Sequence, residues 1–129
     1  MTTLLSEHAV VRRGAATPCD WCRETINPGD PYVRSGCATD GAAYTLRMHI
    51  ECHCAAGDTP DPHGDGVSMG EGRRGVALDE DGEEFGDPAD RLRRGMEWWR
   101  NERKRHAITT ASIKAAGVLR RYAEGCDAD

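Results

Sequence analysis

The sequence predicts an α+β fold in which a small module of strands and one short helix precedes a pair of C-terminal helices. Turn signals divide residues 17–57 into short segments of β character. Between residues 87 and 125, apolar residues recur at spacings of three and four, as on one face of a helix. The apolar content is low, since Leu, Ile, Val and Phe number 17 of 129 residues, about 13%. A core this thin needs support beyond hydrophobic burial.

The first 57 residues divide into an N-terminal arm, 1–16, and a compact module, 17–57. Gly, Pro, Asn and Asp mark the turns, and β-branched and aromatic residues favour strands between them. The module ends in a segment without Pro or Gly, which we expect to be helical until Gly57. The expected elements are a knuckle at Pro18–Cys22, a turn at Asn27–Asp30, strands at Tyr32–Ser35 and Tyr44–Met48 with a turn near Asp40-Gly41, and a helix at His49–Ala56.

Residues 58–86 differ in composition from the module before them. They hold 7 of the 15 glycines, two prolines and nine acidic residues. Such a composition predicts a long acidic, Gly-rich loop or linker. Its few large apolar residues, Val76, Leu78 and Phe85, are candidates for packing against the module.

Residues 87–125 are expected to form a helical hairpin, followed by a short tail, 126–129. Asp87 is a suitable N-cap and Pro88 suits the first helical position. The first helix would bury Leu92, Met96 and Trp99. A second helix would begin near Thr109 or Thr110 and end at Gly125, with one apolar side formed by Ala111, Ala115, Val118 and Tyr122 after Ile108.

Two pairs of potential metal ligands lie inside the module. Cys19 and Cys22 are three residues apart on the knuckle, and His49 and Cys52 have the same spacing at the expected helix. A knuckle directs two sulfurs to one point, and residues three apart on a helix share a face. Three thiolates and one imidazole suit a tetrahedral Zn²⁺ and fill its coordination shell, which predicts one structural rather than catalytic zinc.

The order of knuckle, β-hairpin and helix resembles the treble-clef zinc folds. The Cys-x2-Cys and His-x2-Cys spacing also resembles the zinc fingers of poly(ADP-ribose) polymerases and, less closely, the first half of LIM domains. A group of small uncharacterised phage and prophage zinc proteins is more similar still. The shared string, within residues 15–57, is Cys19-x2-Cys22-x3-Ile26-x2-Gly29, Tyr32, Arg34, Asp40-Gly41 and Met48-His49-x2-Cys52.

The remaining cysteines leave two alternatives open. Cys37, Cys54 and Cys126 could belong to a second metal site with His53 or His63, or they could be ordinary thiols. A secreted disulfide scaffold is the less favoured interpretation of six cysteines, because residues 1–11 do not resemble a signal peptide. No stretch is apolar enough to span a membrane. We therefore expect a cytoplasmic protein with reduced thiols.

The net charge of -5 conceals a strong segregation along the chain. Residues 58–90 contain 11 acidic and 2 basic residues, whereas residues 91–121 contain 10 basic and 2 acidic ones. A charge asymmetry of this size suggests separate roles for the two segments. The candidate interaction residues in the basic segment are Trp98, Arg94, Arg100, Arg103 and Arg105.

The sequence favours a non-enzymatic zinc protein that acts by protein–protein contact. The resemblance to phage proteins implies a host protein as partner, for example a nuclease or defence complex that the factor inhibits. The alternative is a nucleic-acid-binding protein that uses the basic C-terminal helices. A treble-clef nuclease is the least favoured class, because His49 is already assigned to the metal. The oligomeric state is open.

Overall fold

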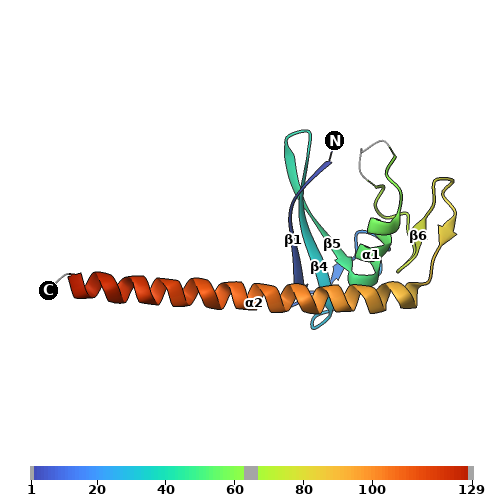
Figure 1. The fold of residues 1–129 in the computed structure, drawn as a ribbon. Helices are drawn as coiled ribbons and strands as arrows, with labels where there is room; N and C mark the ends of the chain where they lie inside the picture. Colours follow the sequence, from blue (N-terminus) through green and yellow to red (C-terminus); the bar gives the residue numbers. More distant parts are fainter. Residues whose placement is uncertain (1, 63–66, 128–129) are drawn as a thin grey trace.

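A three-stranded antiparallel sheet forms one layer of the protein (Figure 1). The computed structural model describes residues 2–62 and 67–127. Strand β4 (Pro31–Thr39) lies at the centre of the sheet, between β1 (Thr2–Val11) and β5 (Ala42–His49). Helix α1 (Ile50–Asp58) follows β5 directly, and the long helix α2 (Pro88–Asp127) crosses the sheet end and α1. The α+β class is therefore confirmed.

The β4–β5 hairpin confirms the two predicted strands and extends both of them. Its turn consists of Asp40 and Gly41, with φ of 52° and 83°. Both values lie in the left-handed region, as a two-residue turn of type I′ requires. The register pairs Thr39 with Ala42 at the turn and Tyr32 with His49 at the open end. The hairpin thus delivers His49 to the point where α1 begins.

The N-terminal arm is a strand, which the sequence analysis did not anticipate. β1 pairs with β4 along its length, with Ala9 opposite Val33, and the register shifts once between Leu4 and Ser6. A central strand such as β4 gains backbone hydrogen bonds on both edges only if a second neighbour is present. Residues 2–11 supply that neighbour, although Leu4 is exposed and no clear alternation of apolar residues marks the strand.

The helix predicted after the hairpin is present and runs slightly further than expected. Gly57 lies inside α1, which ends at Asp58. The end is capped by Thr59, whose backbone N–H and side-chain hydroxyl both donate to the Ala55 carbonyl, at 3.1 and 2.8 Å. The threonine cap, rather than the glycine, therefore terminates the helix.

The predicted helical hairpin over residues 87–125 is wrong, because the structure has one helix of 40 residues. Asp87 does cap its start, since the Ala89 N–H donates to Asp87 Oδ1 at 3.0 Å. No second helix begins near Thr109. This residue lies inside α2, and its hydroxyl donates to the Arg105 carbonyl at 3.0 Å. No Pro or Gly interrupts residues 96–116, so nothing in the sequence forces a turn there.

The face of α2 that packs on α1 differs in part from the predicted one. Met96 and Trp99 are half-buried, and Trp99 Nε1 donates to the Tyr32 carbonyl at 3.2 Å, but Leu92 is not buried. Arg91, Gly95 and Trp98 face the body of the protein, whereas Leu92 is 43% exposed. A Cβ atom on Gly95 would lie 2.5 Å from Ile50 Cγ2 and 2.9 Å from Cys54 Sγ. Gly95 therefore sets how closely α1 and α2 approach each other. The spacing of apolar residues could not predict the contact made by Arg91 and Gly95, because neither residue type is counted as apolar in such a pattern.

Residues 59–62 and 67–87 are mostly irregular, with one short hairpin of β6 (Ala77–Leu78) and β7 (Glu84–Phe85). The segment does contact the module, chiefly through its backbone and Ala77. Trp21 Nε1 donates to the Val76 carbonyl at 3.1 Å, and Ala77 is fully buried. Phe85 is 39% exposed, and its ring lies under the Arg91 guanidinium, 5.2 Å from the ring centroid.

The core forms around the cysteines rather than around a large apolar cluster. It joins the knuckle, the hairpin, α1 and β6. Its buried members are Cys19, Trp21, Ile26, Tyr32, Met48, Cys52, Ala55 and Ala77. With so few large apolar side chains, the fold depends on whatever holds the cysteines together.

Candidate metal centre

Cys19, Cys22, His49 and Cys52 converge at one point. Their potential ligand atoms all lie within 4.8 Å of one another, and all of these residues except Cys22 are buried. Residues from two distant parts of the chain thus meet as the sequence predicts. Their spacing is compatible with a single bound metal ion.

The knuckle that carries Cys19 and Cys22 lies between two short strands, β2 (Thr17–Pro18) and β3 (Thr25–Ile26). Cys19 N–H donates to the Glu24 carbonyl at 2.8 Å, and Arg23 N–H donates to the Cys19 carbonyl at 2.9 Å. Arg23 has a φ of 69°, which lets the chain reverse directly after Cys22. These bonds hold both sulfurs on the same side of the turn.

Asp20 fastens the knuckle to strand β5. Its backbone N–H donates to the Arg47 carbonyl at 2.8 Å, and its carboxylate accepts the Arg47 N–H at 2.7 Å. Arg47 lies two residues before His49. The bonds therefore help to set the distance between the two ligand pairs.

The imidazole of His49 is oriented by a backbone contact. Nε2 lies 3.2 Å from the Thr25 carbonyl, to which it donates as the protonated nitrogen. Nδ1 then faces the sulfurs, 3.4 Å from Cys22 Sγ and 3.8 Å from Cys52 Sγ. A hydrogen bond on the far nitrogen that fixes the tautomer is typical of metal-bound histidines. His49 would therefore bind through Nδ1.

The three thiols do not titrate alike. A hydrogen bond from Cys52 lowers the pKa of Cys19 to about 3, against the effect of burial. Donating that bond raises the pKa of Cys52, and burial raises the pKa of Cys22 to about 11. The protein thus holds one thiolate among proton donors. A bound cation would replace those protons, so metal uptake would release them.

The donor set fits zinc. Three sulfurs and one imidazole nitrogen are soft to borderline ligands, and four protein donors complete a tetrahedron. The surroundings agree with a structural site, because Trp21 and Ala55 beside it are fully buried. The ion would be held by Cys19, Cys22, His49 and Cys52. It would cross-link the knuckle to the hairpin and to α1.

The other cysteines form no second cluster of metal ligands among the described residues. Cys37 lies buried in β4, where burial raises its pKa. Cys54 is half-buried in α1, beside α2. His63 and the side chain of Cys126 lie outside the described part of the chain, so their part in the second-site alternative stays open.

Trp98 and Arg94, two of the predicted interaction residues, are engaged within the protein. Trp98 is half-buried and stacks on His53, with ring centroids 5.1 Å apart. Arg94 bonds to Asp58 at 2.9 Å and to Asp90 at 3.0 Å. The acidic segment thus neutralises part of the basic helix within one chain.

The other three candidates, Arg100, Arg103 and Arg105, are exposed on α2. The Arg103 guanidinium lies over the Trp99 ring, 5.3 Å from its centroid, and Arg105 pairs with Glu102 at 3.0 Å. Arg103 and Arg105 also line a groove of about 400 Å³ between β1 and α2. Its other polar walls are Glu7, His8, Arg34, Glu102 and His106.

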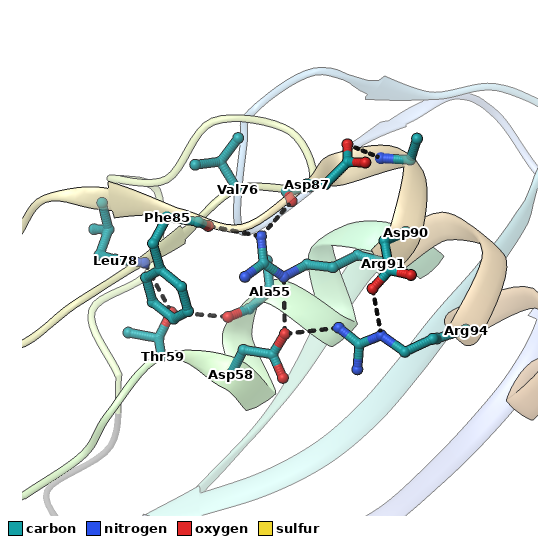
Figure 2. Close-up of polar contacts among 12 residues, drawn as sticks. Ala55, Asp58, Thr59, Val76, Leu78, Phe85, Asp87, Asp90, Arg91 and Arg94 are labelled. Carbon is teal, nitrogen blue, oxygen red and sulfur yellow. Dashed lines mark hydrogen bonds and ion pairs between the residues drawn. The ribbon is translucent and has the colours of Figure 1, made fainter.

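Sequence reasoning missed Arg91, which is 2% exposed and joins three parts of the fold (Figure 2). Its Nε donates to Asp58 Oδ2 at 2.8 Å, at the end of α1. One terminal nitrogen, Nη1, donates to the Gly75 and Phe85 carbonyls at 3.0 and 2.9 Å. Arg91 therefore anchors the acidic segment against both helices. No local pattern distinguishes it from its arginine neighbours.

A pH-sensitive contact links the sheet to α1. His53 Nε2 lies 2.6 Å from Glu7 Oε1. Burial disfavours the charge on His53, but hydrogen bonds with Cys54 and Glu7 and the Glu7 charge outweigh it and raise the pKa of His53 to about 9. The raised pKa means that folding gains stability below the unfolded value near 6.5 and loses it as the pH rises through about 9.

We expect the free energy of unfolding to fall by about 1–3 kcal/mol between pH 7 and pH 10 because of this contact. Denaturant melts of the wild type and of His53→Gln across that range would measure it. The difference between the two should shrink as the pH rises. A difference that stays constant would contradict the assignment.

Comparisons with protein-family models, curated proteins and solved structures returned no match. Within residues 2–62 and 67–127, no helix combines the length and apolar character needed to cross a bilayer.

Proposed function

We propose that this chain is a non-enzymatic zinc protein that acts by contact with another protein. The observation that carries the proposal is the closed cluster of Cys19, Cys22, His49 and Cys52 at the centre of the core. Zinc in such a shell has no open position for substrate or activated water. Its role would be to hold the scaffold, and the function would lie on the surface that the scaffold presents.

The acidic segment is the surface best suited to that role. Residues 79–89 are exposed, while Arg91 and Trp21 bind the segment's backbone from below. Asp79 Oδ1 accepts the N–H groups of Asp81 and Glu83, both at 2.9 Å, which fixes the turn of the β6–β7 hairpin. The negative charges are therefore displayed on an ordered backbone, which reduces the entropy cost of binding.

The partner that fits this surface is a protein with a basic cleft. Two neighbouring hollows in the segment are lined by acidic residues, among them Asp61, Glu71, Asp79, Glu80 and Asp81. An ordered array of carboxylates can occupy a site that normally receives phosphates. The resemblance to phage proteins makes a host nuclease or defence complex the expected partner, inhibited by occlusion.

Capture from host lysate on the zinc-loaded chain tests the proposal. A protein should be retained after nuclease treatment, and it should be lost with the triple variant Glu71→Gln, Glu80→Gln, Asp81→Asn. Glu97→Gln, an exposed change on α2, is the matched control and should capture as the wild type does. Equal capture by the triple variant, or loss of all bound material after nuclease treatment, would contradict it.

Nucleic-acid binding is the second candidate, and the groove between β1 and α2 favours it. Arg34, Arg103 and Arg105 approach this groove from two elements, in the way that phosphate-binding surfaces are built. The measurement that separates the candidates is the salt dependence of binding to a labelled oligonucleotide. A log–log slope near -0.9 per phosphate contacted, lost when Arg103 and Arg105 are both replaced by Gln, would establish this second function.

A further inference from the structure

The second half of α2 extends beyond the sheet and the other helix (Figure 1). Between residues 107 and 116, every side chain is exposed except that of Thr110, which is half-buried. Gly117 is half-buried as well. Ile108 and Ile113 are 62% and 67% exposed. A helix of about 20 residues without tertiary packing is only marginally stable in water. Residues 107–116, the part of this extension whose side chains the structure describes, therefore have little of the packing that normally supports a helix.

One face of this extension carries an apolar pattern with a period of 3.5 residues. Ile108, Ala111 and Ala115 lie on it, and the sequence continues the spacing of three and four with Val118, Tyr122 and Gly125. A 3.5-residue period is the pattern of a helix that pairs with another helix. The sequence alone suggested an intramolecular hairpin for this face, but the continuous helix leaves it without that partner.

We propose that a second copy of this chain covers the face, with the two α2 extensions packed antiparallel. If residue 111 lies opposite residue 122 of the other copy, 108 lies opposite 125 and 115 opposite 118. Each pair then joins a large residue type to a small one: Ile with Gly, Ala with Tyr, and Ala with Val. Such alternation fills the space between two helices evenly. A parallel pair would place Ala on Ala and Tyr on Tyr.

The charges favour the same orientation. Residues 103–105 are all basic, whereas residues 122–127 contain two acidic residues and no basic one. In this register, antiparallel packing brings Asp127 of each chain near Lys104 and Arg105 of the other. Parallel packing would place each charged stretch against its like, which is unfavourable. Both size and charge therefore select a second copy in one orientation.

The body of the protein does not obstruct this arrangement. Successive helical residues turn by about 100°, so Ile108 and Ala111 lie about 140° and 160° around α2 from Gly95. Gly95 faces α1, and Trp98 stacks on His53. The partner helix can therefore lie along the outer side of α2, and the two bodies come to opposite ends of the pair.

The mass of the full, zinc-loaded chain in solution tests the proposal. Sedimentation across a concentration series should give twice the 14.1 kDa of one chain. Ala111→Glu should raise the dissociation constant at least tenfold, whereas Ile113→Glu, a change on another face of α2, should leave it within twofold. Glu is a good helix former, and circular dichroism checks that both variants keep their helix. A monomer throughout, or equal effects of the two variants, overturns the proposal.

Orientation is tested by zero-length cross-linking in a mixture of isotopically light and heavy chains. Antiparallel packing should join Lys104 to Asp127 in peptides of mixed isotope composition. Within one helix these residues are about 35 Å apart, too far for a direct amide bond. A dimer in which Lys104 cross-links only within its own chain, or in which like positions cross-link, overturns the antiparallel arrangement.

Discussion

Replacement of Cys22 by Ser, or removal of zinc with a chelator, is expected to abolish the cooperative thermal transition of this protein. A structural zinc contributes roughly 10–16 kcal/mol to the folding of small modules, which is as large as a typical domain's whole stability. Here the core is built around the ligands Cys19 and Cys52, and both would lose their cross-link to the hairpin. Near-UV circular dichroism and calorimetry on the metal-free and zinc-loaded protein would measure the loss.

The matched control is Cys54→Ser. Cys54 lies in the same helix as Cys52, two residues further on, and it is not in the ligand cluster. A Ser side chain there keeps a hydrogen-bonding group beside His53, so we expect a change of about 1 kcal/mol at most. Metal analysis should give about one zinc per chain for the wild type and the control. A Cys22→Ser variant that melts as the wild type does would refute the structural role.

The parts of the fold that the sequence predicted are the ones encoded locally. The Asp40-Gly41 turn needs two residues with positive φ, and few residue types besides Gly, Asn and Asp adopt that conformation readily. The spacing of Cys19, Cys22, His49 and Cys52 reflects a knuckle and a helix start, each only a few residues long. Such features leave a signature in adjacent residues, and the structure brings all four ligands together.

The features that sequence analysis missed depend on contacts between distant segments. β1 is stabilised by pairing with β4 rather than by its own alternation, since Leu4 and Leu5 are both exposed. The α2 face that packs on α1 includes Gly95, which permits a close approach, and Arg91. Two partners of Arg91, Asp58 in α1 and the Gly75 carbonyl, lie more than ten residues away in the sequence. Neither Gly95 nor Arg91 contributes to an apolar pattern, so periodicity could not identify the face.

Arg91→Met is expected to destabilise the protein by about 2–4 kcal/mol, because two carbonyls lose a charged donor and the partly exposed ion pair with Asp58 loses one member. The Gly75 and Phe85 carbonyls would lose a donor, and Asp58 would keep only Arg94 as its charged partner. Urea unfolding at pH 7 would measure the loss. Arg93→Met is the control, because the Arg93 side chain is 73% exposed and pairs with Asp90 at the surface. A change of at most about 1 kcal/mol is expected there.

A double variant, Arg91→Met with Asp58→Leu, separates the two causes of that loss. Replacing both members of an ion pair by apolar residues removes the carboxylate that would otherwise lose one of its two arginine partners. The stability loss that persists in the double variant therefore measures the cost of leaving the Gly75 and Phe85 carbonyls without the Arg91 donor. We expect this cost to be about 1–3 kcal/mol. If the double variant is as unstable as Arg91→Met alone, the anchoring of the acidic segment depends on the carbonyl contacts, and the ion pair with Asp58 is incidental.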